Sequence, residues 1–128
     1  HGLTSLYGNP LVVRNIIQHR DERIGVCMDA GWITAAGFDA AKVYNAYKGR
    51  VYDIHLKDKT VEITDRKLVG ISANIGKGDA NIKGLIEVLK ASSFNGVLAI
   101  ETDSPIFARQ PAEFVSSAKA YYESLVNP

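Results

Sequence analysis

The sequence predicts an α/β fold built on a parallel sheet. Three short apolar runs, at residues 24–28, 51–54 and 97–100, are separated by segments in which apolar residues recur with helical spacing. Strands that alternate with helices are joined by crossovers, which leave the strands parallel. Each run is also followed by a residue that can bind a metal, namely Asp29, His55 and Glu101. Because the carboxyl ends of parallel strands meet at one edge of the sheet, we expect these three side chains to converge.

The first elements follow from capping signals and apolar spacing. Asn9 and Pro10 are typical of a helix start, with asparagine as the N-cap and proline at the first helical position. The apolar residues that follow predict a helix to about residue 20: Leu11, Val12, Ile16 and Ile17. Residues 23–29 are the first predicted strand. Residues 38–47 form the second predicted helix, with Gly49 just past its end.

The middle of the chain interrupts this alternation. Residues 50–56 form the second predicted strand, but residues 57–81 contain a predicted hairpin, with strands at 60–63 and 67–71. A glycine-punctuated stretch follows at residues 76–79. Insertions of this length inside a compact unit usually serve a function. The third helix (82–91), the third strand (97–101) and a fourth helix (111–126) then complete an α-βα-βα-βα order.

Composition narrows the class of protein. The chain has 128 residues, enough for one domain with a real core, and 15 basic and 14 acidic residues give a net charge of +1. No basic patch predicts binding to nucleic acid, and no apolar stretch or leader predicts a membrane span or export. We therefore leave the location unknown, with the cytoplasm as the default. The single cysteine, Cys27, lies within an apolar run and is predicted to be a buried, inert thiol.

The start of the chain is unusual for this fold class. A helix comes first with no strand before it, and three parallel strands would leave two open sheet edges. We therefore interpret residues 1–128 as a single partial domain. Either a missing N-terminal part of the same protein or a partner chain would complete it.

The three strand-end residues have alternative interpretations. Asp29 could cap a turn before Gly31, and His55 could be a hydrogen-bonded core histidine. Glu101 closes an apolar strand, where a buried, unpaired carboxylate would be costly. A bound divalent cation would remove that cost. Taken together, two carboxylates and an imidazole favour a metal site.

Two further motifs lie near the predicted site. Lys57 and Asp58 directly follow His55, and they predict either a salt-bridged loop pair or contacts to the metal ligands or to a substrate phosphate. In the Gly76-Lys77-Gly78 segment, backbone amides and the Lys77 ammonium could hold an anion. His19, among charged residues near a helix end, is predicted to be a surface residue.

Four segments in this order resemble one family. They are residues 24–32 (IGVCMDAGW), 50–58 (RVYDIHLKD), 75–79 (IGKGD) and 96–101 (GVLAIE), and the opening His1-Gly2 is similar to the tail of an Asn-His-Gly motif. The chain thus resembles the xylose-isomerase-like barrel superfamily of sugar phosphate isomerases and epimerases, which also contains DNA repair enzymes of the endonuclease IV type. The resemblance covers nearly the whole chain, but each motif is short, and only their order makes it specific.

The resemblance implies that the chain is the C-terminal half of a (β/α)8 TIM barrel, with about the last three βα units and the helix before them. It places Asp29, His55 and Glu101 on a divalent metal ion, which could be Mn, Mg, Co or Zn. A fourth ligand would lie upstream of His1. Glu101 would also be the catalytic acid or base. His1, Trp32, Lys57 and Lys77 are the expected contacts to a small-molecule sugar.

One position departs from the family pattern. The family often has histidine three residues after the first aspartate, where this chain has Trp32, which could stack on a sugar or simply pack. No histidine follows His55, which argues against a histidine-rich trinuclear zinc site and against DNA repair. We expect a metal-dependent sugar or sugar-phosphate isomerase or epimerase that acts through an enediolate. The alternatives are a noncatalytic sugar-binding barrel, an inosose-type dehydratase and an endonuclease IV-like enzyme.

Overall fold

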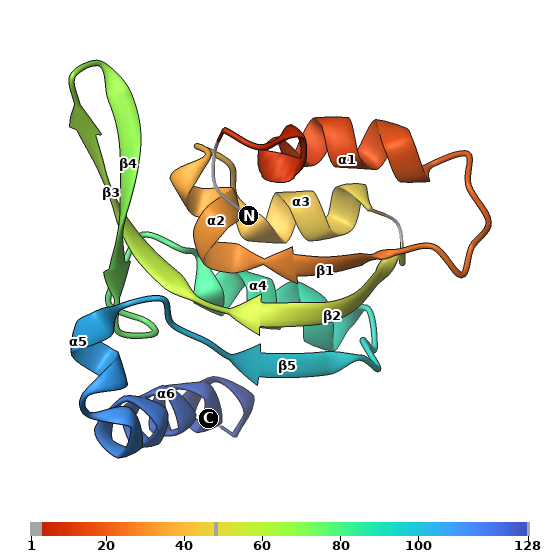
Figure 1. The fold of residues 1–128 in the computed structure, drawn as a ribbon. Helices are drawn as coiled ribbons and strands as arrows, with labels where there is room; N and C mark the ends of the chain where they lie inside the picture. Colours follow the sequence, from red (N-terminus) through yellow and green to blue (C-terminus); the bar gives the residue numbers. More distant parts are fainter. Residues whose placement is uncertain (1–3, 48, 128) are drawn as a thin grey trace.

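A computed structural model describes residues 4–47 and 49–127 and contains the expected parallel sheet. Its strands are β1 (Val26–Asp29), β2 (Val51–Leu56) and β5 (Val97–Ile100), in the order β1-β2-β5. They run side by side in one direction (Figure 1). The strand ends are in register, because Asp29 pairs with His55 and Leu56 pairs with Ile100. The predicted α/β fold with a parallel sheet is therefore confirmed.

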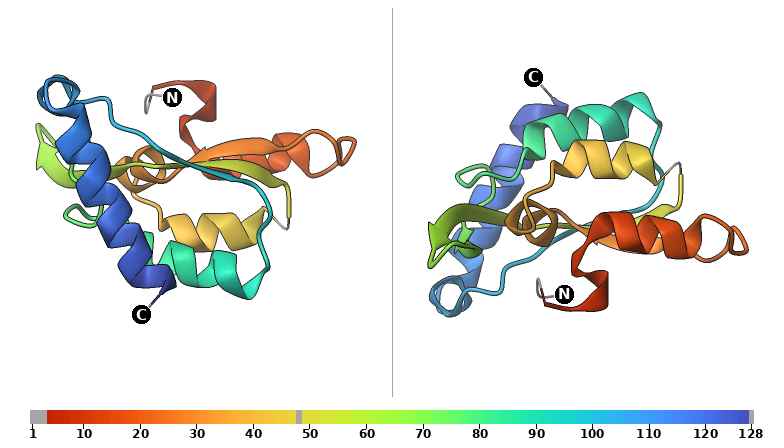
Figure 2. Two further views of the ribbon diagram at one scale, coloured as in Figure 1. Left: turned by 90° about the horizontal axis from the view of Figure 1, so that it is seen from below. Right: turned by 90° about the horizontal axis from the view of Figure 1, so that it is seen from above.

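Helices cover one face of this sheet. Figure 2 shows α3 (Ala40–Ala46) and α4 (Ile82–Ala91) on the same side of the strands. Helix α6 (Pro111–Val126) crosses near the edge of the sheet that β5 forms. The remaining helices are α1 (Pro10–Ile17), α2 (Ala30–Ala35), α5 (Pro105–Ala108) and a short 3-10 turn, η1 (Leu6–Gly8). Within the described residues no helix has the length and apolar character needed to cross a membrane.

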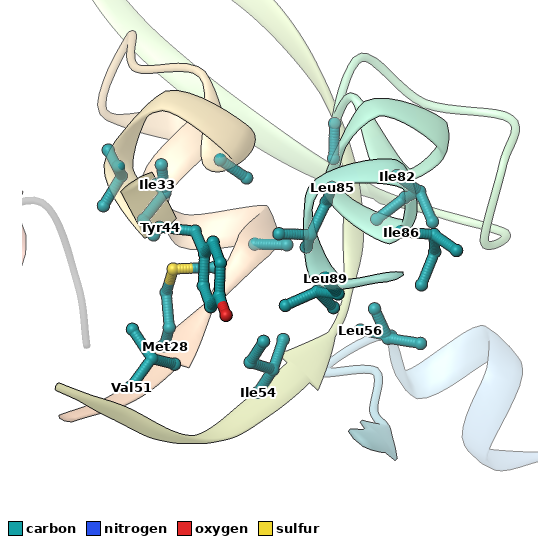
Figure 3. Packing of buried hydrophobic residues seen from close by; sticks show 14 of the residues in the cluster. Met28, Ile33, Tyr44, Val51, Ile54, Leu56, Ile82, Leu85, Ile86 and Leu89 are labelled. Atoms are coloured by element: carbon teal, nitrogen blue, oxygen red, sulfur yellow. The ribbon is translucent and has the colours of Figure 1, made fainter. Parts of the chain in front are cut away.

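The core lies between the sheet and the helix layer (Figure 3). Met28, Ile54 and Leu56 point from the strands toward the helices, and each is at most 2% exposed. From the helices, Leu85 and Leu89 pack against them. Burying side chains of this size contributes about 1.5–3 kcal/mol each, so this layer supplies much of the driving force for folding.

Several boundaries differ from the sequence prediction. Helix α1 ends at Ile17 rather than near residue 20, and β1 begins at Val26 rather than 23. Between them the Asp21 side chain accepts hydrogen bonds from the backbone amide and the guanidinium of Arg23, which forms a local turn instead of regular structure. The sequence analysis also missed α2, which begins directly after β1 with Asp29 as its N-cap.

The hairpin is longer than predicted. Strands β3 (Asp58–Thr64) and β4 (Lys67–Ala73) are antiparallel and project from the body of the molecule (Figure 1). Asp65 and Arg66 form the two-residue turn, and both have positive φ values of 50° and 61°. Two residues of this conformation match the twist of paired strands. Because only Lys57 separates the end of β2 from the start of β3, the side-chain alternation of β2 continues into the hairpin.

The loop after the hairpin closes around a buried carboxylate. Asp58 is 1% exposed and accepts hydrogen bonds from the backbone amides of Gly76, Gly78 and Ala80 at 2.8, 2.9 and 3.0 Å. A Cβ atom on Gly78 would lie 2.3 Å from Asp58 Oδ1, so only glycine fits there. The amides of Gly76 and Gly78 do hold an anion, as the sequence suggested, but this anion is the protein's own Asp58 carboxylate. The predicted Lys57–Asp58 pair is not formed.

We expect Asp58→Ala to lower the free energy of unfolding by at least about 3 kcal/mol, because it leaves three amide donors without their acceptor. Denaturant unfolding measures this loss. The matched control is Glu87→Ala, which removes an exposed carboxylate from α4 and should change stability by less than about 0.5 kcal/mol. Equal, small effects of the two substitutions would contradict the role assigned to Asp58.

Candidate metal centre

The three strand-end residues come together as the sequence predicts. Asp29 ends β1, His55 lies one residue before the end of β2, and Glu101 follows β5. The Glu101 amide donates to the Leu56 carbonyl at 3.2 Å, which extends the strand pairing to this residue. One potential ligand atom from each side chain lies within 4.8 Å of the other two. Their convergence is observed, while their role as metal ligands stays a prediction.

Asp29 serves two purposes at once. Its Oδ1 accepts a hydrogen bond from the Trp32 amide at 2.9 Å, which caps helix α2. Its Oδ2 lies 3.9 Å from His55 Nδ1. The turn-capping interpretation is therefore correct, and it does not compete with a place in the cluster. Instead, capping fixes the carboxylate so that the second oxygen faces the other strand ends.

The strongest sign of a cation site is at Glu101. Its Oε2 is inaccessible to solvent and lies against His55 Nδ1 at ion-pair distance. Burying a carboxylate oxygen is costly unless a positive group pairs with it. A divalent cation held by Glu101, His55 and Asp29 would remove that cost. The donor set of two carboxylates and one imidazole suits such an ion.

Lys57 already supplies one positive charge to this cluster. Its ammonium Nζ lies 2.8 Å from Glu101 Oε1 and 3.0 Å from Asp29 Oδ2, and the residue is 3% exposed. Burial alone lowers the pKa of Lys57, but the hydrogen bonds to Glu101 and Asp29 outweigh it and the pKa is raised. Two carboxylates against one ammonium leave a net negative charge. The cluster can therefore accept a further cation.

Room for Lys57 is provided by the helix that Asp29 caps. A Cβ atom on Gly31 would lie 2.8 Å from Cγ of Lys57, which is closer than such atoms pack. Lys57 thus contacts two of the predicted metal ligands, Asp29 and Glu101, and its predicted contact to a substrate phosphate stays a prediction.

Trp32 lies beside two lysines. Its ring centroid is 4.3 Å from Lys59 Nζ and 6.0 Å from Lys57 Nζ, distances at which an ammonium is attracted to an aromatic face. These contacts show Trp32 packing within the protein, and its role as a sugar platform stays a prediction.

Lys59 also pairs with Asp103 at 2.9 Å. The Asp103 pKa is lowered: burial raises it, but hydrogen bonds from Ser72 and Lys59 outweigh burial.

The sequence analysis missed Lys59 and Asp103, although a signal was present. Each lies two residues beyond a residue that it did single out, Lys57 and Glu101 respectively. In an extended segment such spacing places side chains on the same face. The polar face of the sheet, opposite the helix layer, thus continues past the strand ends into the hairpin.

The remaining residues predicted from the sequence are Cys27, Lys77, His19 and His1. Cys27 is exposed rather than buried, because strand alternation turns Met28 toward the helices and Cys27 toward the opposite face. Lys77 is exposed, and its predicted substrate contact stays a prediction. His19 is exposed as predicted. His1 lies outside the described residues.

Residues 5–124 match a family model described as a xylose isomerase-like TIM barrel. The chain belongs to the xylose isomerase-like TIM barrel family. An inosose dehydratase from Lacticaseibacillus casei is 23% identical over 117 residues, which cover 83% of this chain and 39% of the relative. An inosose dehydratase from Clostridium perfringens is 27% identical over 110 residues, covering 77% and 37%. The chain therefore spans about two fifths of the length of these curated relatives.

Solved structures show the same fold. The crystal structure of a xylose isomerase domain protein from Planctomyces limnophilus superposes with a TM-score of 0.76 at 20% identity, over 98% of this chain and 44% of that one. A D-tagatose 3-epimerase-like protein superposes with a TM-score of 0.64 at 19% identity, over 93% and 43%. The described sheet corresponds to part of a barrel in these structures.

We expect Lys57→Met to make the cluster depend on a bound metal. Without metal, Asp29 and Glu101 lose their cation, and the free energy of unfolding should fall by about 2–3 kcal/mol. Mn²⁺ should then raise the melting temperature of this variant more than that of the unsubstituted protein, because the competing ammonium is gone. Thermal unfolding with and without Mn²⁺ measures both effects.

Lys59→Met is the matched control. It removes an ammonium that is equally buried but pairs with Asp103 instead of the cluster. It should lose stability while keeping the Mn²⁺ response of the unsubstituted protein. If Mn²⁺ shifted all three proteins equally, the ion would not be competing with Lys57.

Proposed function

We propose that this chain carries the metal-binding part of an active site that isomerises or epimerises a sugar or sugar phosphate through an enediolate. The observation that carries the proposal is the convergence of Asp29, His55 and Glu101 at the ends of three parallel strands. Membership of the xylose isomerase-like family supports the same class of chemistry. Because the chain spans under half of its relatives, the proposal concerns the whole protein.

The metal would activate the substrate for proton removal. A divalent ion such as Mn²⁺, Mg²⁺, Co²⁺ or Zn²⁺ would polarise the substrate carbonyl and make the adjacent C–H more acidic. Asp29, His55 and Glu101 are the residues of this chain that would hold it. An upstream residue would supply a fourth ligand.

Glu101 is the proposed proton carrier. Its side chain is 38% exposed, so a substrate could reach it from the open side of the sheet. Lys57 holds Oε1, and Oε2 lies against His55 Nδ1. A carboxylate fixed in this way beside a metal site is suited to taking a proton from one carbon and returning it to a neighbour. A second acid or base would come from the rest of the protein.

A dehydratase acting on an inositol-derived ketone is the second candidate. The names of the curated relatives favour it, since six matching proteins are called inosose dehydratases. The same proton abstraction next to a carbonyl would begin this reaction, and loss of a neighbouring hydroxyl as water would complete it. The two candidates therefore share a site and differ in what happens after the proton leaves.

A noncatalytic sugar-binding barrel is the rival from a different class. The feature that favours it is Trp32, which replaces a histidine that the family often carries. A protein of this kind would bind sugar and metal without exchanging any substrate hydrogen. We infer catalysis rather than binding alone because the matching relatives are named as enzymes, the inosose dehydratases.

We expect Glu101→Gln in the whole protein to lower kcat by about 10²–10⁴-fold, because proton transfer loses its carboxylate. KM should change less, since the loss is felt mainly in the transition state. The assay incubates the protein with Mn²⁺ and free or phosphorylated ketoses in deuterated water. It then follows deuterium at the carbon beside the carbonyl and sugar interconversion.

Glu87→Gln, the same substitution at an exposed position on α4, should leave turnover unchanged. Release of water from an inosose, without ketose interconversion, would move the assignment to the dehydratase. If no substrate exchanged hydrogen or turned over, and Glu101→Gln bound sugar normally, the noncatalytic alternative would hold.

A further inference from the structure

A second group of metal-binding side chains lies on the same face of the sheet, further from the strand ends. It consists of Cys27, Asp53 and His55, and one potential ligand atom from each lies within 4.8 Å of the other two. Cys27 in β1 and Asp53 in β2 are register partners in the parallel ladder. His55 lies two residues after Asp53 on the same strand, so both point to the same side. Backbone pairing therefore sets this grouping.

An independent observation also points to a cation at this group. Asp53 Oδ1 is inaccessible to solvent and has no hydrogen-bond partner among the described residues. Within the same group, Cys27 Sγ lies 3.4 Å from His55 Nε2. A buried carboxylate oxygen costs free energy unless it is paired. A cation between the thiol, the imidazole and the carboxylate would pair it.

The electrostatic surroundings agree with this geometry. Three carboxylates place negative charge near Cys27: Asp53, Asp29 and Glu101. They favour a divalent cation, which would neutralise them and displace the thiol proton.

We propose that Cys27, Asp53 and His55 form a binding site for a thiophilic divalent cation such as Zn²⁺. Thiolate, imidazole and carboxylate are the ligands that zinc prefers, whereas Mg²⁺ and Mn²⁺ prefer oxygen. Three protein ligands leave one tetrahedral position for water. The thiol proton passes to solvent when the ion binds, and no group is oxidised or reduced.

This site would compete with the first one for His55. Nδ1 of the ring faces Glu101 and Asp29, while Nε2 faces Cys27. A neutral imidazole has one unprotonated nitrogen, so it can serve one ion at a time. A hard cation would draw His55 toward the strand ends, and a soft cation would draw it toward Cys27. Zn²⁺ in the second site would thereby weaken Mn²⁺ binding in the first.

Cobalt gives a direct test, because a thiolate bound to Co²⁺ produces a charge-transfer band in the near ultraviolet. We expect this band when Co²⁺ is added to the whole protein, and we expect Zn²⁺ to abolish it. Cys27→Ser should lack the band. Glu101→Gln should keep it, because Glu101 belongs only to the first site. Losing even a neighbour of a metal ligand typically costs about 10–100-fold in affinity, so Asp53→Asn should bind Co²⁺ at least about tenfold more weakly.

A second measurement follows the Cys27 thiol directly and does not depend on a Cys27 variant that folds. Zn²⁺ should slow alkylation of Cys27 by N-ethylmaleimide in the unsubstituted protein and in Glu101→Gln. It should give much less protection in Asp53→Asn, and Mg²⁺ should give none. Both readouts report binding alone, so they stand whether or not the protein turns over a sugar.

A cobalt band that persists in Cys27→Ser would overturn the proposal. A band that disappears in Glu101→Gln would also overturn it, because a single site would then account for all binding. Absence of both the band and zinc protection in the unsubstituted protein would have the same meaning.

Discussion

Side-chain alternation across the parallel sheet is the constraint on which the other features depend. In β1, β2 and β5 one set of side chains must enter the helix layer, where Met28, Ile54 and Leu56 are almost completely buried. Their neighbours in sequence then necessarily point to the opposite face. Cys27, Asp29 and His55 are among these neighbours. The apolar core and the polar cluster are therefore two consequences of a single register.

The polar face is stabilised by lysines as well as by hydrogen bonds. Lys57 and Lys59 are both almost fully buried. Lys57 pairs with Asp29 and Glu101, and Lys59 pairs with Asp103. Trp32 lies beside both ammonium groups, so cation–π attraction adds to the ion pairs. The Lys57 ammonium balances part of the negative charge of Asp29 and Glu101, so ion pairs within the protein hold the cluster together. This arrangement links folding to the proposed chemistry.

The chain is much shorter than the barrel proteins that share its fold. The fold is shared with barrel proteins over nearly the whole chain, but the chain corresponds to less than half of each of them. Within the described residues β1 and β5 are the edges of the sheet. The cluster faces the side that the helix layer leaves uncovered. The proposed substrate, fourth metal ligand and second proton carrier therefore concern the whole protein.

The sequence by itself determined the elements and the meeting of their ends. Helices α4 and α6 have the predicted bounds, and Asp29, His55 and Glu101 converge as the strand order predicts. These features follow from apolar periodicity and from the direction of parallel strands, which are local properties of the chain. The hairpin was also visible from its alternation, although it proved longer.

Only the tertiary structure decided which polar groups are partners. Asp58 binds amides 18 to 22 residues away, and Lys57 pairs with Glu101 44 residues away. The partnership of Cys27 with Asp53 depends on an irregularity in the β1–β2 register, where the pairing shifts between Val26 and Cys27. Periodicity shows which face a side chain occupies, but not what lies opposite it. That information exists only after the strands have paired and the loops have closed.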